Sequence, residues 1–389
     1  MAPPPPSSRE EVKNTEVDEV QKNGQPNDEI QKPTHTNKAI LPSLSNLQDF
    51  FYLATGLALP YATHPLTAIE ILLPGLVNMW PFSSSETFNP EKDIPSLADK
   101  VILVTGGNAG LGKETVLQLA KHNPHKIFLA SRTEAKASDA IASIKASISQ
   151  DVDIEFLPLD LASLPSVHEA ADQVTSRTNR LDILILNAGI MAVPEGKTAS
   201  GQEIQLGTNH VGHFLLTKLL LPLLQKTATQ YNPDVRIISL SSEAWNFGPK
   251  LDTILSTEKL STQGPWARYG ASKAANIMFA AEFARRYPAF TSVSLHPGMI
   301  HTDLYAANSQ TNPLVRYGSK LIGPLIFQSI EAGAFNTLWL AAGANKEVLK
   351  NGQYYTPVGK VQNNKWATDA AAGKKLWGWT EAELRKAGY

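Results

Sequence analysis

Residues 101–112 read VILVTGGNAGLG, an apolar run that passes directly into a glycine-rich turn. Val101–Thr105 has the apolar, β-branched composition of a buried strand, and a helical pattern starts at Gly110. Glycines at such a turn let the backbone approach a pyrophosphate, whose charge the N-terminus of the next helix favours. The turn therefore predicts a dinucleotide-binding strand–helix unit, although glycine-rich turns also serve as plain strand–helix junctions.

The pattern of a strand followed by a helix repeats along the rest of the chain. Near-continuous apolar strands that alternate with amphipathic helices are typical of a parallel sheet covered on both faces. We therefore expect one doubly wound α/β domain over residues 96–389, with seven strands in a mainly parallel sheet. The expected strands are Val101–Thr105, Ile127–Ala130, Ile154–Pro158, Ile183–Asn187, Val235–Ser241, Ser292–His296 and Gln353–Pro357. The expected helices are Gly110–His122, Thr133–Ile148, Ser163–Thr175, Glu203–Leu224, Trp266–Tyr287 and Ala332–Ala342.

Residues 1–95 differ in composition from that domain. Residues 1–40 are rich in Pro, Asn, Gln, Lys and Glu, so they cannot bury enough apolar surface to fold, and a disordered polar tail is expected. Residues 41–95 form a hydrophobic extension, but its apolar runs are shorter than the ~20 residues of a membrane-spanning helix. Two interpretations are open: helices packed on the main domain, or an anchor that holds residues 47–82 to the endoplasmic reticulum membrane or a lipid droplet.

The overall composition excludes several classes of function. With Lys+Arg 35 against Asp+Glu 36, the formal net charge is −1, so we expect no nucleic-acid partner. The chain has no cysteine, and its 9 histidines show no zinc-binding spacing, so no metal site is expected. The N-terminus lacks the apolar core of a secretory signal, and we expect an intracellular protein that is cytoplasmic or peripheral to a membrane.

The ends of the second, third and fourth strands indicate how a dinucleotide would be bound. A carboxylate at the end of the second strand would bind the ribose hydroxyl of NAD, whereas Arg132 suits a 2′-phosphate. This favours NADP(H) over NAD(H); the alternative is a solvated surface arginine. Asp160 could accept a hydrogen bond from adenine or cap the next helix. The small Asn-Ala-Gly turn at residues 187–189 would let the backbone lie against a ribose.

Tyr269 and Lys273 lie four residues apart, on one face of an expected helix. The ordinary pKa of a tyrosine is ~10, and a nearby cation lowers it enough to make the phenol a usable general acid or base. Such pairs also occur by chance, so the surroundings decide. Ser241 and Ser242 follow the fifth strand, at the edge where open α/β sheets bind ligands. Asn209 interrupts a long apolar helix, where a buried amide needs partners.

Together these motifs resemble the short-chain dehydrogenase/reductase family, most of all its retinol dehydrogenase-like and fungal ketoreductase branch. The resemblance covers about residues 98–360 and implies a Rossmann-type fold. The motifs match in order and spacing: TGGNAGLG at 105–112, LDLAS at 159–163, LNAG at 186–189, TNHVGHF at 208–214, SLSS at 239–242, YGASK at 269–273 and HPGMIHTDL at 296–304.

The resemblance also implies which residues carry the chemistry. The implied catalytic tetrad is Asn209, Ser242, Tyr269 and Lys273, with Ser241 as the alternative serine. The implied cofactor-binding residues are Gly106, Asn108, Gly110, Leu111, Gly112, Arg132, Asp160, Asn187, Ala188, Gly189, Tyr269, Lys273, Pro297, Gly298, Ile300 and Thr302.

In the family pattern each member of the tetrad has its own role. Tyr269 exchanges a proton with the substrate oxygen, and Lys273 lowers the pKa of Tyr269 and holds the nicotinamide ribose. Ser242 binds the substrate oxygen, and Asn209 holds a water that leads to Lys273. The chain departs from the family at Leu186, where asparagine is usual, and this puts one tie between strands in doubt.

The expected function is that of an NADP(H)-dependent carbonyl reductase or alcohol dehydrogenase in lipid, retinoid-like or secondary metabolism. Residues 304–327, where the family places a substrate lid, are largely apolar, and Trp245, Phe247 and Trp266 flank the site, so a small hydrophobic substrate is expected. Aromatic residues are also common in cores. The alternative function is a catalytically idle nucleotide-binding Rossmann scaffold. The resemblance further suggests a homodimer that pairs through the helices at 203–224 and 266–287.

Overall fold

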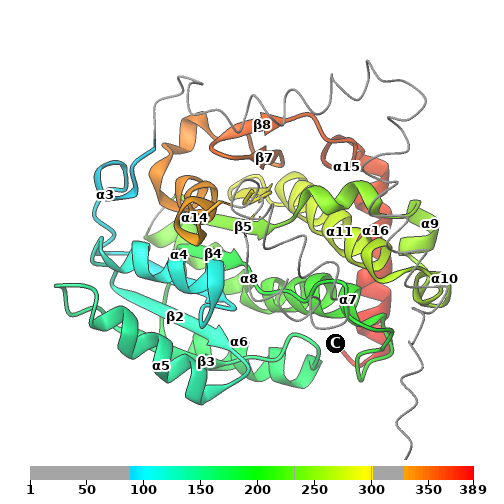
Figure 1. Cartoon of the computed structure of the whole chain (residues 1–389), viewed down its shortest axis with the longest axis horizontal. Coiled ribbons are helices and arrows are strands. Elements are labelled where there is room, and N and C mark those ends of the chain that lie inside the picture. The colour runs from blue at the N-terminus through cyan, green and yellow to red at the C-terminus, as the bar shows by residue number, and fades with distance from the viewer. Residues whose placement is uncertain (1–87, 232, 299, 301–327) are drawn as a thin grey trace, which may run out of the picture. The chain divides into compact units, whose positions relative to one another are not determined.

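The computed structural model describes residues 88–231, 233–298, 300 and 328–389, which belong to one unit of the chain (Figure 1). A single sheet of eight strands lies at its centre, in the order β3-β2-β1-β4-β5-β6-β7-β8. All neighbouring strands pair in parallel except β7 and β8, which are antiparallel. The strands are β1 Val101–Thr105, β2 Lys126–Ser131, β3 Ile154–Pro158, β4 Ile183–Leu186, β5 Arg236–Leu240, β6 Thr291–Leu295, β7 Tyr354–Thr356 and β8 Lys360–Gln362.

The doubly wound α/β fold is confirmed, but the expected number of seven strands is wrong by one. The additional strand is β8, which forms a hairpin with β7 through a turn in which Gly359 has a φ of +69°. β8 has three residues, and Lys360 and Val361 are exposed. A strand so short and so exposed lacks the apolar alternation on which a sequence-based prediction depends.

Most of the helices connect successive strands of the sheet, whereas α3 precedes β1 and α15 and α16 follow β8. The α-helices are α3 Pro90–Asp93, α4 Gly110–Ala120, α5 Glu134–Lys145, α6 Leu164–Arg177, α7 Ile204–Leu206, α8 Gly212–Gln230, α9 Leu251–Ile254, α10 Thr257–Ser261, α11 Pro265–Arg286, α14 Ile330–Leu338, α15 Lys365–Thr368 and α16 Ala370–Lys386. Two π-helical turns, η1 Gly207–Val211 and η3 Trp339–Gly343, and two 3₁₀ turns, η2 Glu243–Phe247 and η4 Lys346–Val348, complete the described elements.

Alternate residues of the strands pack into two hydrophobic cores, which lie on opposite faces of the sheet. On β1, Val101 and Leu103 join the core formed with α6 and α8, whereas Ile102 and Val104 join the core formed with α4, α5 and α14. This alternation follows from the two-residue period of a strand. Because both faces are covered, the strands are apolar along their whole length.

The C-terminal helix α16 packs against α11, as Figure 1 shows. Its Trp377 stacks on Phe279 of α11 with ring centroids 6.1 Å apart and meets Phe214 of α8 edge-on at 4.6 Å. The sequence analysis predicted no helix in this region. A pairing of two chains through this part of α11 would require α16 to move away from it.

Several expectations fall outside the described residues: the polar tail at 1–40, residues 47–82, the apolar segment 304–327 and Thr302. Over the ranges that the structure describes, no helix combines the length and the apolar character needed to cross a bilayer.

Candidate active site

The glycine-rich turn lies between β1 and α4, at the carboxyl edge of the sheet. Gly106 and Gly110 have φ values of +68° and +49°, which favour glycine. A Cβ atom on Gly112 would lie 2.1 Å from the carbonyl oxygen of Gly106. Ala109, which precedes α4, offers no side-chain cap, so the first N–H groups of the helix keep their capacity for an anion. The turn therefore fits the pyrophosphate of a dinucleotide.

The turn after β4 is tied directly to the glycine-rich turn. The amide of Asn187 donates to the carbonyl oxygen of Thr105 at 2.7 Å, and the N–H of Ala188 donates to the Thr105 hydroxyl at 2.9 Å. A Cβ on Gly106 would lie 3.0 Å from the Cα of Ala188. Asn187 thus joins the two strand ends, although Leu186 replaces the asparagine that is usual in the family.

The adenosine side of the expected cofactor site is built from the ends of β2 and β3. Arg132 is exposed, and its guanidinium makes no hydrogen bond or ion pair with any described residue, so it can meet a phosphate. The hydroxyl of Ser131 is buried and has no partner among the described residues. Asp160 accepts from the N–H of Ala162 at 3.0 Å, whereas Ser163 caps α6, which removes the capping role considered for Asp160.

The remaining predicted cofactor residues lie around the same edge. Asn108 is half-buried in the glycine-rich turn, and Pro297 and Gly298 follow β6, where Gly298 has a φ of +100°. Ile300 is buried against α14, because a Cβ on Gly333 would meet its Cδ1 at 2.1 Å. Leu111 approaches the same glycine, with its Cδ2 3.0 Å from that Cβ position.

Tyr269 and Lys273 lie on the first turns of α11 and are both buried, with 8% and 5% of their surface exposed. The Lys273 ammonium lies 5.5 Å from the centre of the Tyr269 ring and donates to the carbonyl oxygen of Leu240 at 3.0 Å. Burial lowers the pKa of Lys273 to about 8. At neutral pH, Lys273 is therefore a cation held beside the phenol with little water around it.

The two serines after β5 have different hydrogen bonds. The hydroxyl of Ser241 donates to the carbonyl oxygen of Lys273 at 2.8 Å, so it is occupied in holding β5 to α11. The hydroxyl of Ser242 accepts from the N–H of Ala244 at 3.2 Å, and its own proton has no acceptor among the described residues. The geometry therefore favours Ser242 over Ser241 as the serine that meets a substrate oxygen.

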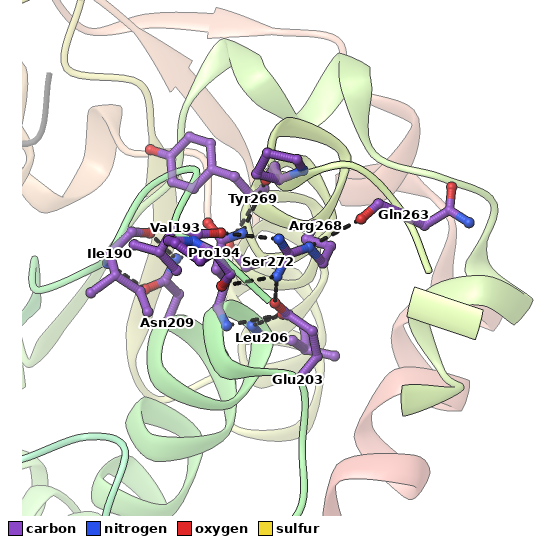
Figure 2. Close-up of polar contacts among 12 residues, drawn as sticks. Ile190, Val193, Pro194, Glu203, Leu206, Asn209, Gln263, Arg268, Tyr269 and Ser272 are labelled. Atoms are coloured by element: carbon purple, nitrogen blue, oxygen red, sulfur yellow. Dashed lines mark hydrogen bonds and ion pairs between the residues drawn. The ribbon is translucent and has the colours of Figure 1, made fainter. Parts of the chain in front are cut away.

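Asn209 lies in the π-turn η1, which interrupts the helix expected over 203–224. The N–H of Gly212 bonds to the carbonyl oxygen of Gly207, five residues earlier. The Asn209 amide accepts from the N–H of Ile190 at 2.8 Å and donates to its carbonyl oxygen and to the Ser272 hydroxyl, both at 2.9 Å (Figure 2). Asn209 thus clamps the turn after β4 to α11.

Gly189 explains how Asn209 and Lys273 come together. A Cβ on Gly189 would lie 3.2 Å from the Oδ1 of Asn209 and 3.6 Å from the Nζ of Lys273. The missing side chain brings the backbone of this turn between the two residues. The structure therefore gathers all four residues of the predicted tetrad around the carboxyl ends of β4 and β5.

The aromatic residues expected around the site have different surroundings. Trp266 meets Tyr269 edge-on, with ring centroids 6.3 Å apart. Trp245 packs against the core beside α11, and Phe247 is 36% exposed. Of the three, Trp266 is the one that the structure places against the phenol of Tyr269.

His213 is a buried residue of this site that the sequence analysis did not identify. Its Nδ1 lies 2.9 Å from the carbonyl oxygen of Asn209, which can only accept, so Nδ1 carries the proton. Its Nε2 then accepts from the Thr105 hydroxyl at 2.8 Å. Burial lowers the pKa of His213 to about 4, and the nearby Lys273 cation acts in the same direction. A neutral His213 thus connects the glycine-rich turn to η1.

A second feature that the sequence analysis missed is a buried ion pair next to Tyr269. The Arg268 guanidinium is 3.0 Å from the carboxylate of Glu203, and the two side chains are 3% and 0% exposed (Figure 2). The one available signal was the charged Arg268 directly before Tyr269 of the Tyr–Lys motif. The partner lies 65 residues away, so the pairing itself could not be read from the sequence.

The chain is similar to known proteins over most of its length. The family model described as short chain dehydrogenase matches residues 100–313. A short-chain dehydrogenase/reductase of Armillaria gallica is 38% identical over 319 residues, which cover 79% of this chain and 99% of that protein. Retinol dehydrogenase 14 of Mus musculus is 32% identical over 293 residues, which cover 72% of this chain and 84% of that protein.

A solved structure shares the fold. The crystal structure of an uncharacterized protein from Mycobacterium paratuberculosis superposes with a TM-score of 0.58 at 31% sequence identity. The match covers 76% of this chain and 97% of that one.

Proposed function

Because the chain belongs to the short-chain dehydrogenase/reductase family, we propose that it is an NADP(H)-dependent reductase or dehydrogenase acting on a hydrophobic carbonyl compound or the matching alcohol. Members of this family are oxidoreductases that bind a nicotinamide cofactor, which favours an enzyme over an idle scaffold. The observation that carries the proposal is the position of the Tyr269–Lys273 pair. It lies at the same edge of the sheet as a glycine-rich turn that fits a pyrophosphate.

The bound nicotinamide would supply or accept the hydride. Tyr269 would donate a proton to the substrate oxygen during reduction and take it back during oxidation. Lys273 would favour the ionised phenol through its positive charge and would hold the hydroxyls of the nicotinamide ribose. Ser242, whose hydroxyl proton is available, would bind the substrate oxygen. The protein thus orients the reactants and polarises the oxygen.

Asn209 would support this proton transfer by holding a water that leads to Lys273. Both N–H groups of its side-chain amide donate, to Ile190 and Ser272, and the amide oxygen accepts from Ile190, whereas its backbone carbonyl oxygen accepts from His213. A carbonyl oxygen has two lone pairs, so this one can still accept from a water that leads to Lys273. The backbone carbonyl oxygen is the part of Asn209 that we propose for the water.

Arg132 supports the proposed preference for NADP(H). Its guanidinium is exposed at the end of β2, without a partner among the described residues. A planar fork of this kind binds a phosphate through two parallel hydrogen bonds. The end of β2 carries no carboxylate that would bind the ribose hydroxyl of NAD.

A small apolar cluster supports a hydrophobic substrate. Met191, Ala192 and Ala244 are buried together with Tyr269, and Trp266 packs against them. A substrate carbonyl that reaches Tyr269 would therefore lie beside apolar side chains. We propose that residues 304–327 add an apolar lid to this surface, and that residues 47–82 hold the enzyme near a membrane or lipid droplet.

The test is NADPH oxidation by the full chain against a panel of aldehydes and ketones, from small and polar to large and apolar. We expect turnover that improves with apolar size, and a kcat/KM with NADPH at least about tenfold above that with NADH. The substitution Arg132→Ala should remove most of that cofactor preference, whereas Lys145→Ala, which removes an exposed charge at the far end of α5, should not. The proposed function would be contradicted if the chain neither reduced any of these carbonyl compounds nor oxidised any of the matching alcohols.

A further inference from the structure

The turn that follows β4, residues 190–194, packs on the ring of Tyr269. Met191 and Ala192 are buried in the same cluster as Tyr269 and Ala244. Ala192 has a φ of +48°, in the left-handed region that residues other than glycine rarely adopt. Such a conformation persists only where its surroundings hold it in place. Two clamps, one at each end of the turn, provide that restraint.

The first clamp is Asn209, which binds both the N–H and the carbonyl oxygen of Ile190. The second is Arg268, whose guanidinium donates to the carbonyl oxygens of Val193 at 3.0 Å and Pro194 at 3.4 Å. Figure 2 shows the two clamps, with Asn209 beside Ile190 and Arg268 beside Val193 and Pro194. Met191 and Ala192 are therefore held in place from both sides.

Arg268 is itself fixed by Glu203 and by the loop before α11. Its Nη1 donates to the Glu203 carboxylate at 3.0 Å, and its Nε donates to the carbonyl oxygen of Gln263 at 3.1 Å. The second oxygen of Glu203 accepts from the N–H groups of Gln205 and Leu206 at 2.9 and 2.8 Å, which caps α7. Both charges are buried, and every nitrogen and oxygen of the pair makes at least one hydrogen bond.

The ion pair therefore joins three parts of the site. It holds the turn at 190–194, the first turn of α11 directly before Tyr269, and the short helix α7 that leads into the π-turn of Asn209. A guanidinium reaches four acceptors in different directions because its donors form a rigid fork. A lysine ammonium at this position would keep the charge but could not hold all four acceptors.

We propose that Arg268 and Glu203 are positioning residues for the proton transfer at Tyr269. Through the turn at 190–194 they set the orientation of the phenol and the shape of the apolar surface beside it. The inference rests on the proposed function, since it concerns the same reaction. It predicts that the pair controls kcat and the choice between short and long substrates, while cofactor affinity does not depend on it.

The test compares Arg268→Lys with Arg236→Lys. Arg236 is a matched control because it is also buried and also binds one carboxylate, of Asp234, and two carbonyl oxygens, of Leu340 and Ala344. It lies at the start of β5, at the opposite edge of the sheet from Tyr269. For each variant, kcat is measured per NADPH-binding site, so that any loss of folded protein is corrected.

We expect Arg268→Lys to lower kcat per site about tenfold and to raise KM for decanal more than for propanal, with NADPH affinity unchanged within about twofold. Arg236→Lys should leave kcat per site and the ratio of the two KM values unchanged. Glu203→Asp keeps the charge and shortens the side chain. It should lower kcat per site less than Arg268→Lys does, and raise KM for decanal over propanal to a smaller extent. It serves as the second variant if Arg268→Lys yields little protein.

The proposal is overturned if both site variants keep the wild-type kcat per site, or if they lose NADPH binding and activity together, as a purely structural pair would. Wild-type protein and Tyr269→Phe are assayed alongside. An inactive wild type, or an active Tyr269→Phe, would instead contradict the proposed function. The two failures are therefore distinguishable.

Discussion

The two edges of the sheet differ in how their buried charged side chains are paired. At the amino edge, Arg236 and Asp182 each lie at or next to the start of a strand, and each is paired with an opposite charge. At the carboxyl edge, Arg268 is paired with Glu203, whereas among the described residues the Lys273 ammonium hydrogen-bonds to a carbonyl oxygen alone. No carboxylate in the described part of the chain forms an ion pair with Lys273.

This difference separates groups that stabilise the fold from groups that are kept for chemistry. A buried, paired and hydrogen-bonded charge recovers much of its desolvation cost, whereas an unpaired one does not. The lowered pKa of Lys273 reflects that uncompensated cost. The carboxyl edge thus keeps a destabilising cation beside Tyr269, where its field can act on the phenol.

The largest effect on stability is expected at the amino edge. The substitution Arg236→Met removes the hydrogen bonds that Arg236 donates to the Asp234 carboxylate and to two buried carbonyl oxygens. We expect the free energy of unfolding to fall by about 3 kcal/mol, because the variant loses an ion pair and leaves two buried carbonyl oxygens without the donor they have in the wild type. Urea unfolding measures this change, and kcat per NADPH site should stay at the wild-type value.

An exposed ion pair provides the control for that measurement. Arg177 binds Glu155 on the surface, with 39% of the arginine side chain exposed. Arg177→Met should cost less than about 1 kcal/mol. If both variants lost the same free energy of unfolding, or if Arg236→Met lowered kcat per site, the proposed difference between the two edges of the sheet would be contradicted.

A smaller effect of opposite sign is expected for Lys273→Met. The carbonyl oxygen of Leu240 also accepts from the Asn276 amide at 2.9 Å, so it is not left without a donor. Removing the buried ammonium should therefore raise the free energy of unfolding near pH 7 by about 1–3 kcal/mol, while activity falls by at least about a hundredfold.

The gain from Lys273→Met should depend on pH in a defined way. The folded-state pKa of Lys273, about 8, lies below its ordinary value of 10.5. Below about pH 8 the folded and unfolded wild-type chains both carry this proton, so burial exerts its full cost. Between about pH 8 and pH 10.5 only the unfolded chain keeps the Lys273 proton, so the free energy of unfolding of the wild type rises towards that of the variant. A variant that is less stable than wild type near pH 7 would contradict this account.

Much of the fold could be predicted because its signals are local. The apolar runs, the glycine-rich turn and the helical periodicity predicted the first seven strands, within one or two residues at most ends. β8 escaped prediction because three exposed residues carry no periodic signal. The π-turn at Gly207–Val211 escaped because its polar residues Thr208, Asn209 and His210 mark an interruption of the apolar pattern but do not show that the helix widens there.

The site could be predicted only where its residues form a known spacing. Tyr269 and Lys273 share one helix face, so their proximity follows from geometry, and the choice of Ser242 over Ser241 needed the hydrogen bonds of the structure. The pairs Arg268–Glu203 and His213–Thr105 join residues 65 and 108 positions apart. Tertiary packing makes such contacts, and no local pattern in a single sequence records them.

The most direct test of the central claim is the turnover of Tyr269→Phe, measured per bound NADPH with a carbonyl that the wild-type chain reduces. The substitution removes one hydroxyl and keeps the ring that packs on Trp266. If Tyr269 is the proton donor, kcat should fall by at least about a thousandfold while NADPH binds as tightly as before. Turnover close to that of the wild type, with normal NADPH binding, would contradict the assignment of this edge of the sheet as the active site.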